Sequence, residues 1–271
     1  MIHTQLLRVL LTGTVLLATA VVASGCRGSR GEAAEGSVEA ADDQGLQLSS
    51  CQLSMPGQAL RVPAECGTLN VPEDRQHPEG RQLSLTVAVL RAVRRDPQPD
   101  PLFLLAGGPG QAATEAFLPL LGALRGIRQD RDLVLVDQRG TGSSHPLDCD
   151  MGQEGELDAL DEEEQGERLQ ECLKTWDADP RFYHTAVAME DLDAVRQALG
   201  YQRINLYGVS YGTRSALTYL RMFPERVRTI LLDGVVPPDL VLGVEWGRDA
   251  QRALSLIFDR CRQDEACAEA F

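Results

Sequence analysis

Three short apolar segments, each with glycine near its carboxyl end, constrain the fold of this chain more than any other feature. They are "LFLLAG" (102–107), "DLVLVDQRG" (132–140) and "RINLYGVS" (203–210). Continuous apolar runs of this length are typical of strands buried on both faces of a parallel sheet. Since parallel strands need long connections, usually helices, the intervening segments should hold helices that cover the sheet.

The segments between and after these strands do show helical spacing of apolar residues. Residues 112–126 show it, and a second helix is expected from Thr185, which can cap it, to Gly200, which can end it. The apolar face of that second helix is formed by Ala188, Leu192, Val195 and Leu199. Residues 211–223 and 248–271 are also helical in pattern.

Two further strands complete the expected sheet. Residues 83–90 alternate and predict a half-buried strand, and residues 227–236 predict another. The buried face of the first would be formed by Leu83, Leu85, Val87 and Val89. Because predicted strands and helices alternate along the chain, we expect an α/β fold with a mostly parallel sheet and helices on both faces. In such folds the ligand lies beyond the carboxyl ends of the strands.

The charge of the chain excludes one class of partner. The formal net charge is -14, and phosphate binding needs a basic face, so we expect no nucleic acid partner. Residues 148–179 are acidic, which favours a solvated helix or insertion over a metal or partner site. The chain has no Cys-x-x-Cys and no histidine at metal-binding spacing, so no metal or other cofactor is expected.

The N-terminus has the pattern of an export signal. Residues 1–25 carry Arg8 and then an uncharged run that ends in "VASG", directly before Cys26. This resembles a bacterial lipoprotein processing site, with Cys26 as the lipidated residue. The alternatives are an ordinary cleaved signal or an uncleaved anchor, and the short run disfavours the anchor. Residues 26–48 predict a disordered acidic tether, and residues 49–271 a globular domain.

The cysteine content agrees with export. Of the seven cysteines, six remain if Cys26 is lipidated, which is an even number for an oxidising compartment. Proximity in sequence favours the disulfides Cys51–Cys66, Cys149–Cys172 and Cys261–Cys267. Free buried thiols are the alternative.

Residues 208–212 form a Gly-x-Ser-x-Gly motif between a predicted strand and a predicted helix. In that context the motif places a nucleophilic serine, here Ser210, on a sharp turn with its Oγ exposed. A plain strand–helix turn with a surface serine is the alternative. The "GGPG" at residues 107–110 strengthens the first interpretation, because an oxyanion hole needs backbone N–H groups from such a loop and from the residue after the nucleophile.

Several segments resemble α/β-hydrolases of the proline iminopeptidase and tripeptidyl-aminopeptidase group. They are "AGGPGQ", "DLVLVDQRGTGSS", "NLYGVSYGTRSALTYLRMFPERVRTILLDGVVPP" and, as in secreted members, "ECGTLNVPEDRQHPEG" and "FDRCRQDEACAEAF". The resemblance covers roughly residues 49–271. It implies that Ser210 is the nucleophile, that Gly108 and Tyr211 supply the oxyanion N–H groups, and that residues 137–142 border the pocket.

The position of the histidines is unusual for such an enzyme. The chain has four, His3, His77, His145 and His184, and all precede Ser210. In this fold the order along the chain is serine, acid, histidine. We therefore expect the chain to be the N-terminal part of a longer protein, truncated before the cap and the C-terminal part.

Two residues of this chain could replace parts of the triad. His145 is the nearest candidate base, although a surface histidine is the favoured interpretation. Asp233 could in principle reach a histidine, but a polar residue that closes a strand is favoured.

The sequence therefore predicts a serine hydrolase. The favoured activity is an exopeptidase that cleaves amino acids or short peptides from free N-termini through an acyl-enzyme at Ser210, with little activity in this 271-residue chain. The alternatives are an esterase-type hydrolase and a non-catalytic, lipid-anchored remnant. The expected partners are a peptide or small-molecule substrate and a membrane, reached through the lipid anchor, with the domain exported to the cell envelope.

Overall fold

The structure is a computed structural model that describes residues 45–57, 59–149, 160–241 and 243–270. The predicted signal (1–25), Cys26 and residues 27–44 of the predicted tether lie outside the described residues.

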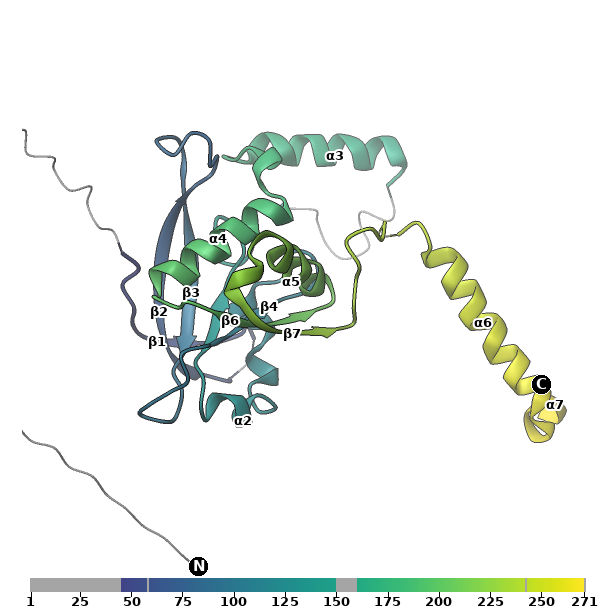
Figure 1. The fold of residues 1–271 in the computed structure, drawn as a ribbon. Coiled ribbons are helices and arrows are strands. Elements are labelled where there is room, and N and C mark those ends of the chain that lie inside the picture. Colours follow the sequence, from purple (N-terminus) through teal and green to yellow (C-terminus); the bar gives the residue numbers. More distant parts are fainter. Residues whose placement is uncertain (1–44, 58, 150–159, 242, 271) are drawn as a thin grey trace, which may run out of the picture. The chain divides into compact units, whose positions relative to one another are not determined.

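Within the described ranges, seven strands form a single sheet in the order β1-β2-β3-β5-β4-β6-β7 (Figure 1). They are β1 (Ser49–Leu53), β2 (Val62–Pro72), β3 (Gln82–Leu90), β4 (Leu102–Leu105), β5 (Leu133–Val136), β6 (Ile204–Val209) and β7 (Val227–Asp233). The neighbours β5, β4, β6 and β7 run parallel, whereas β1, β2 and β3 alternate in direction and β3 is antiparallel to β5. The predicted fold class is confirmed, with the parallel half of the sheet formed by the apolar segments.

Helices lie on both faces of the parallel half. The helices of the described ranges are α1 (Ala113–Ala116), α2 (Arg125–Arg128), α3 (Glu162–Thr175), α4 (Thr185–Ala198), α5 (Tyr211–Met222), α6 (Trp246–Gln263) and α7 (Glu265–Ala270), with short 3-10 turns at Leu118–Leu120, Pro180–Phe182 and Pro224–Arg226. Helices α4 and α5 lie side by side over one face and form one core cluster with it. Residues of α1, the turn after it and the loop around α2 pack on the other face.

The alternating strand β3 is more deeply buried than expected. Its predicted core residues Leu83, Leu85, Val87 and Val89 are all 0 % exposed and belong to the α4–α5 side. Ala88 and Leu90 on the opposite face are also 0 % exposed. The second half of β3 is therefore buried on both faces, because α4 and α5 pack on one face and the segment from α1 to the following turn packs on the other.

Two helix predictions were wrong in detail. Residues 112–126 do not form one helix but two single turns, α1 and α2, separated by a 3-10 turn that contains Pro119. Proline has no N–H and its ring clashes with the preceding turn, which ends a helix. The second helix has His184, not Thr185, at its N-cap. It ends at Ala198, and the predicted Gly200 follows its C-cap residue Leu199 with φ +78°.

Residues shortly before 49 pack on the domain. Leu46 and Leu48, which were predicted to belong to the tether, pack against the core cluster of β3 and α4. A Cβ atom at Gly67 would lie 2.3 Å from the carbonyl oxygen of Gln47, so this segment runs directly over β2.

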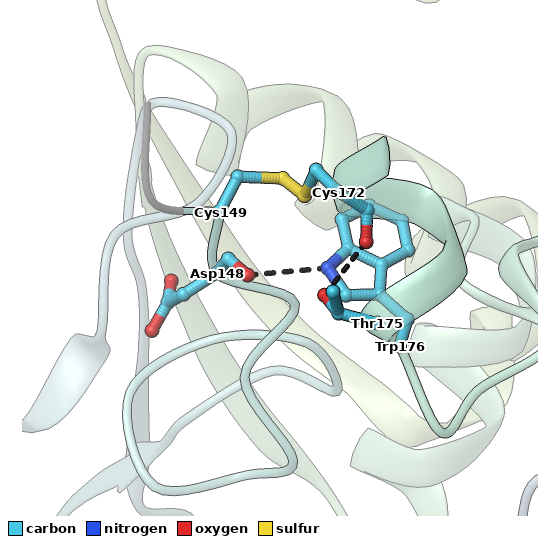
Figure 2. The surroundings of a disulfide bond; sticks show 5 residues. All are labelled: Asp148, Cys149, Cys172, Thr175 and Trp176. Atoms are coloured by element: carbon cyan, nitrogen blue, oxygen red, sulfur yellow. Dashed lines mark hydrogen bonds between the residues drawn. A yellow bond between two sulfur atoms is a disulfide. The ribbon is translucent and has the colours of Figure 1, made fainter. Parts of the chain in front are cut away.

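The six cysteines of the described domain form the pairs Cys51–Cys66, Cys149–Cys172 and Cys261–Cys267. The second pair joins the segment after β5 to α3 (Figure 2). Beside it, the Trp176 indole donates to the carbonyl of Asp148 over 3.2 Å. Helix α3 begins with a capping box at Asp161 and exposes its acidic first turn, in agreement with the predicted solvated helix.

Helix α6 buries none of its residues and exposes Trp246, Leu254, Ile257 and Phe258. Across the described part of the chain, no helix combines the length and the apolar character needed to cross a bilayer.

Replacing both Cys51 and Cys66 by serine should lower the free energy of unfolding by about 3 kcal/mol, because the bond closes a loop of 15 residues and ties β1 to the sheet. Urea denaturation followed by circular dichroism measures this. The matched control, Cys261→Ser with Cys267→Ser, should leave the main transition unchanged, since α6 has no buried residue. If the protein with Cys51→Ser and Cys66→Ser were as stable as the parent, the expectation would be wrong.

Candidate active site

Ser210 lies at the turn between β6 and α5, at the carboxyl edge of the parallel strands. Its backbone has φ 53° and ψ -120°, a region that residues other than glycine rarely adopt. The turn is held by the Ser210 N–H, which donates to the Asp233 carbonyl over 2.8 Å, and by the Ser210 carbonyl, which accepts from the N–H and hydroxyl of Thr213. The residue is solvent-exposed, as a nucleophile on a strained corner must be.

The two glycines of the motif are required by close backbone approaches. A Cβ atom at Gly208 would lie 2.3 Å from the carbonyl oxygen of Gly212. A Cβ atom at Gly212 would lie 2.1 Å from the carbonyl oxygen of Leu105, at the end of β4. The predicted reason for these glycines, a collision with the neighbouring strand and helix, is confirmed.

The glycine-rich loop after β4 meets Ser210 at the same edge. A Cβ atom at Gly107 would lie 3.2 Å from the Cβ of Ser210, so loop and serine are in contact distance. Gly108 and Gly110 have φ values of 100° and 112°, which only glycine adopts readily. The structure thus brings together the segments of Gly108, Ser210 and Tyr211, as the sequence motifs predict.

A cavity opens between this loop and the helices on the α4 side. Gly107, Gly110 and Gln111 of the loop line it, together with the Tyr211 side chain. The apolar part of its wall is formed by Leu85, Leu105, Val136, Ala188, Met189 and Leu192. A few polar groups among apolar side chains are the usual composition of a ligand pocket.

The Tyr211 side chain ties three elements together. Its hydroxyl lies 2.7 Å from the Thr185 hydroxyl at the start of α4, and the amide of Gln138, after β5, reaches it at 3.5 Å. The Thr185 hydroxyl therefore makes a hydrogen bond between α4 and α5 and does not cap α4. This contact was not predicted, because nothing in the local pattern pairs residues 26 positions apart.

Asp137, the first residue of the loop after β5, has a supporting role. Its carboxylate accepts from the N–H and the hydroxyl of Thr114, both at 2.9 Å, which fixes α1 to the end of β5. Burial raises the pKa of this carboxyl group above its usual range. Gly142 closes the loop at φ 52°, and a Cβ atom there would lie 2.4 Å from the Asp137 carboxylate.

The next charged group in that loop, Arg139, forms a buried ion pair that was not predicted. Its side chain is 0 % exposed and that of Asp191, in α4, is 3 % exposed. The guanidinium donates to both carboxylate oxygens, at 2.6 and 2.8 Å, and to the carbonyls of Glu73 and Phe182. Arg75 pairs with the same carboxylate. The available signal was an aspartate on the apolar face of the predicted helix, beside Ala188 and Leu192.

None of the histidines that the structure describes is hydrogen-bonded to Ser210. The His145 Nε2 lies 3.0 Å from the Asp177 carbonyl, and its ring faces Tyr183. His77 pairs with Asp74 at 2.6 Å, and this hydrogen bond raises the pKa of the imidazole. His184 is exposed at the start of α4.

The remaining candidate, Asp233, accepts a hydrogen bond of 2.8 Å from the Tyr207 hydroxyl. This agrees with its favoured interpretation as a polar residue that closes a strand. The described residues contain no cluster of three or more His, Cys, Asp or Glu side chains that could hold a metal ion.

Comparison with known proteins agrees with this geometry. The family profile described as alpha/beta hydrolase fold matches residues 100–262. The serine protease Hip1 of Mycobacterium tuberculosis is 32 % identical over 257 residues, which cover 87 % of this chain and 48 % of Hip1.

Two other relatives are named as peptidases. The tripeptidyl aminopeptidase of Streptomyces coelicolor is 31 % identical over 196 residues, 66 % of this chain and 36 % of that protein. The proline iminopeptidase of Neisseria gonorrhoeae is 28 % identical over 142 residues, 52 % of this chain and 34 % of that protein. The chain thus spans about half the length of Hip1 and about a third of the other two.

Replacing Gly212 by alanine should destabilise the domain by about 3 kcal/mol or more, because the new methyl group would overlap the Leu105 carbonyl. The free energy of unfolding in urea measures this loss. Gly166→Ala is the matched control. Gly166 lies in α3, and a Cβ atom there would meet no neighbour within 4 Å, so alanine should stabilise by up to about 1 kcal/mol. Equal stability of the two variants would refute the close approach.

Proposed function

Since the chain belongs to the α/β-hydrolase fold family, we propose that it carries the nucleophile of a serine exopeptidase. One observation carries the proposal: Ser210 is exposed on a strained strand–helix corner, in contact distance of the glycine-rich loop after β4. Backbone N–H groups and a nucleophile at one edge of the sheet are what acyl transfer requires.

In the proposed reaction the Ser210 Oγ attacks the scissile carbonyl carbon of a peptide. The N–H groups of Gly108 and Tyr211 stabilise the oxyanion that forms. When the tetrahedral intermediate collapses, the C–N bond breaks, the amine leaves with a proton, and the acyl group stays on Ser210. Water then attacks this ester and releases the acid.

The proton of Ser210 needs a base, which neither His145 nor any other described histidine is positioned to supply. Without a base the hydroxyl stays protonated and is a poor nucleophile. We therefore expect the 271-residue polypeptide to turn over amide substrates very slowly. The same observation favours the second candidate, a non-catalytic, lipid-anchored protein.

The names of two relatives, an aminopeptidase and an iminopeptidase, support cleavage next to a free N-terminus over an esterase activity. The proposed substrates are accordingly peptides with a free amino group. The proposed location is the cell envelope, with the domain anchored through a lipid on Cys26. The "VASGC" sequence and the three disulfides of the domain support this location.

Added imidazole should rescue the reaction of Ser210 in the purified 271-residue protein. A free base at high concentration replaces part of the missing general base, so we expect about a tenfold faster release from activated aminoacyl esters, a small part of the ~10²–10⁴ that a positioned base contributes. The measurement is the imidazole-dependent rate minus that of Ser210→Ala under the same conditions, which removes direct hydrolysis by imidazole. Mass spectrometry of fluorophosphonate-treated protein locates the modified serine.

Three outcomes of this experiment would contradict the proposal. Equal rates for the parent and Ser210→Ala would favour the non-catalytic alternative. Equal rates for free and N-acetylated esters would favour an esterase. Strong turnover without imidazole that His145→Ala abolishes would make His145 the base.

The exported protein should begin at Cys26 with a diacylated side chain. Two acyl chains give stable anchoring, because each buried methylene contributes about 0.8 kcal/mol. Intact mass of the membrane fraction measures the modification, and Cys26→Ser should move the protein to the soluble fraction. A parent protein recovered in soluble form with an unmodified Cys26 would refute the anchor.

A further inference from the structure

A groove on the α1 side of the glycine-rich loop is not used by the proposed reaction. Its volume is about 300 Å³, which is at the lower end of the range for ligand sites. One wall is formed by Met55, which follows β1 and packs on the α1 side of the core. The other walls are formed by Glu115 and Ala116 of α1 and by Gly142 of the loop after β5. All the lining residues lie between positions 55 and 142, so the groove does not depend on the segment after β7.

This groove meets the candidate active site at the glycine-rich loop. Gly110 and Gln111 line both the groove and the cavity beside Tyr211. The side-chain oxygen of Gln111 and the Cβ of Ser210 each lie 3.2 Å from the point that a Cβ atom of Gly107 would take. A ligand group held at Gln111 is therefore a close neighbour of the candidate nucleophile.

The polar side chains of the groove are free to bind a ligand. Neither the Glu115 carboxylate nor the Gln111 amide has a hydrogen bond or ion pair with any residue that the structure describes. Among the described residues that line the groove, none is basic. A free carboxylate and a free amide oxygen in such surroundings suit a ligand that carries a positive charge and several N–H donors.

We propose that Glu115 and Gln111 bind the free α-ammonium group of the peptide whose acyl part reacts with Ser210. The inference rests on the proposed function, because that function supplies a substrate with a free N-terminus. The ammonium group donates hydrogen bonds to the Glu115 carboxylate and to the Gln111 side-chain oxygen, while Met55 and Ala116 pack against the first side chain of the peptide. An N-acetylated peptide lacks the charge and keeps a single N–H at that position, so the groove selects free N-termini.

A metal ion fits this groove less well than an ammonium group. Ca²⁺ takes at least about six oxygen ligands, and Mg²⁺ needs a near-octahedral set. The groove offers one carboxylate and one amide side chain. An ammonium group needs only two or three acceptors, which matches this set.

Peptide binding to the Ser210→Ala form of the 271-residue protein tests the proposal without turnover. The probes are trialanine amide and its N-acetylated form, titrated at about pH 6, where the free α-amino group is charged. Binding is followed by isothermal calorimetry or by NMR shifts. The free peptide should bind about fivefold more tightly than the acetylated one, the upper range for a partly exposed ion pair. Raising the pH above the α-amino pKa of about 8 should remove the difference.

Substitutions then locate the bound ammonium group. Glu115→Gln should weaken the free peptide by about fivefold and leave the acetylated peptide unchanged, because the two changes remove the same interaction. Gln111→Ala should also weaken only the free peptide. The matched control is Glu167→Gln, which makes the same charge change at an exposed residue of α3 and should alter neither affinity. Ala116→Phe, which fills the groove without a change of charge, should weaken the free peptide as well.

Four outcomes would overturn the proposal. They are equal affinity for the two peptides, no binding of the free peptide at millimolar concentration, a preference that survives Glu115→Gln, and a preference that Glu167→Gln reduces as much as Glu115→Gln. The last would show general attraction by the net charge of -14. Since these titrations use Ser210→Ala, a failure of the proposed reaction leaves them unaffected, and a failure of binding leaves the imidazole experiment unaffected.

Discussion

The approach of Gly212 to the carbonyl oxygen of Leu105 is the constraint on which the rest of the site depends. Because glycine has no Cβ, the first turn of α5 can lie directly against the end of β4. The chain can then leave β6 only through a sharp corner, which gives Ser210 its φ of 53° and exposes it. The same closeness brings Gly107 against Ser210, since the loop that holds Gly107 starts where β4 ends. The contact between the backbones of Gly212 and Leu105 thus sets the position of Ser210 relative to the glycine-rich loop.

Buried polar side chains hold the loop after β5, which forms the other side of the site. The loop after β5 is held by two buried polar side chains: Asp137, which accepts from Thr114 of α1, and Arg139, which pairs with Asp191 of α4. A buried polar group that loses its hydrogen-bond partner is costly, so these contacts favour one arrangement of the loop. Arg139 also satisfies carbonyl groups of Glu73 and Phe182, and therefore links the end of β2, α4 and the loop without using solvent. The cavity beside Tyr211 keeps its shape because its walls are anchored in this way.

The sequence was sufficient for the elements whose signals are local. The apolar strands, the helices of residues 185–198 and 211–222, and the glycines around Ser210 follow from composition and spacing. The failures have physical reasons: Pro119 overrides helical spacing in residues 112–126, and Thr185 bonds to Tyr211 because α4 and α5 pack together. The Arg139–Asp191 pair joins residues 52 positions apart, and only the fold brings them together. An aspartate on an otherwise apolar helix face was the one local sign of it.

Strand β7 also holds the candidate nucleophile in place. The Ser210 N–H donates to the carbonyl of Asp233, the last residue of β7, so this strand ends directly beside the candidate nucleophile. The serine and the loop N–H groups come from the ends of β4 and β6, and the cavity is lined in addition by residues of β3, β5 and α4. The corner at Ser210 is therefore held from two sides, by the approach of Gly212 to the end of β4 and by the hydrogen bond from the Ser210 N–H to the end of β7.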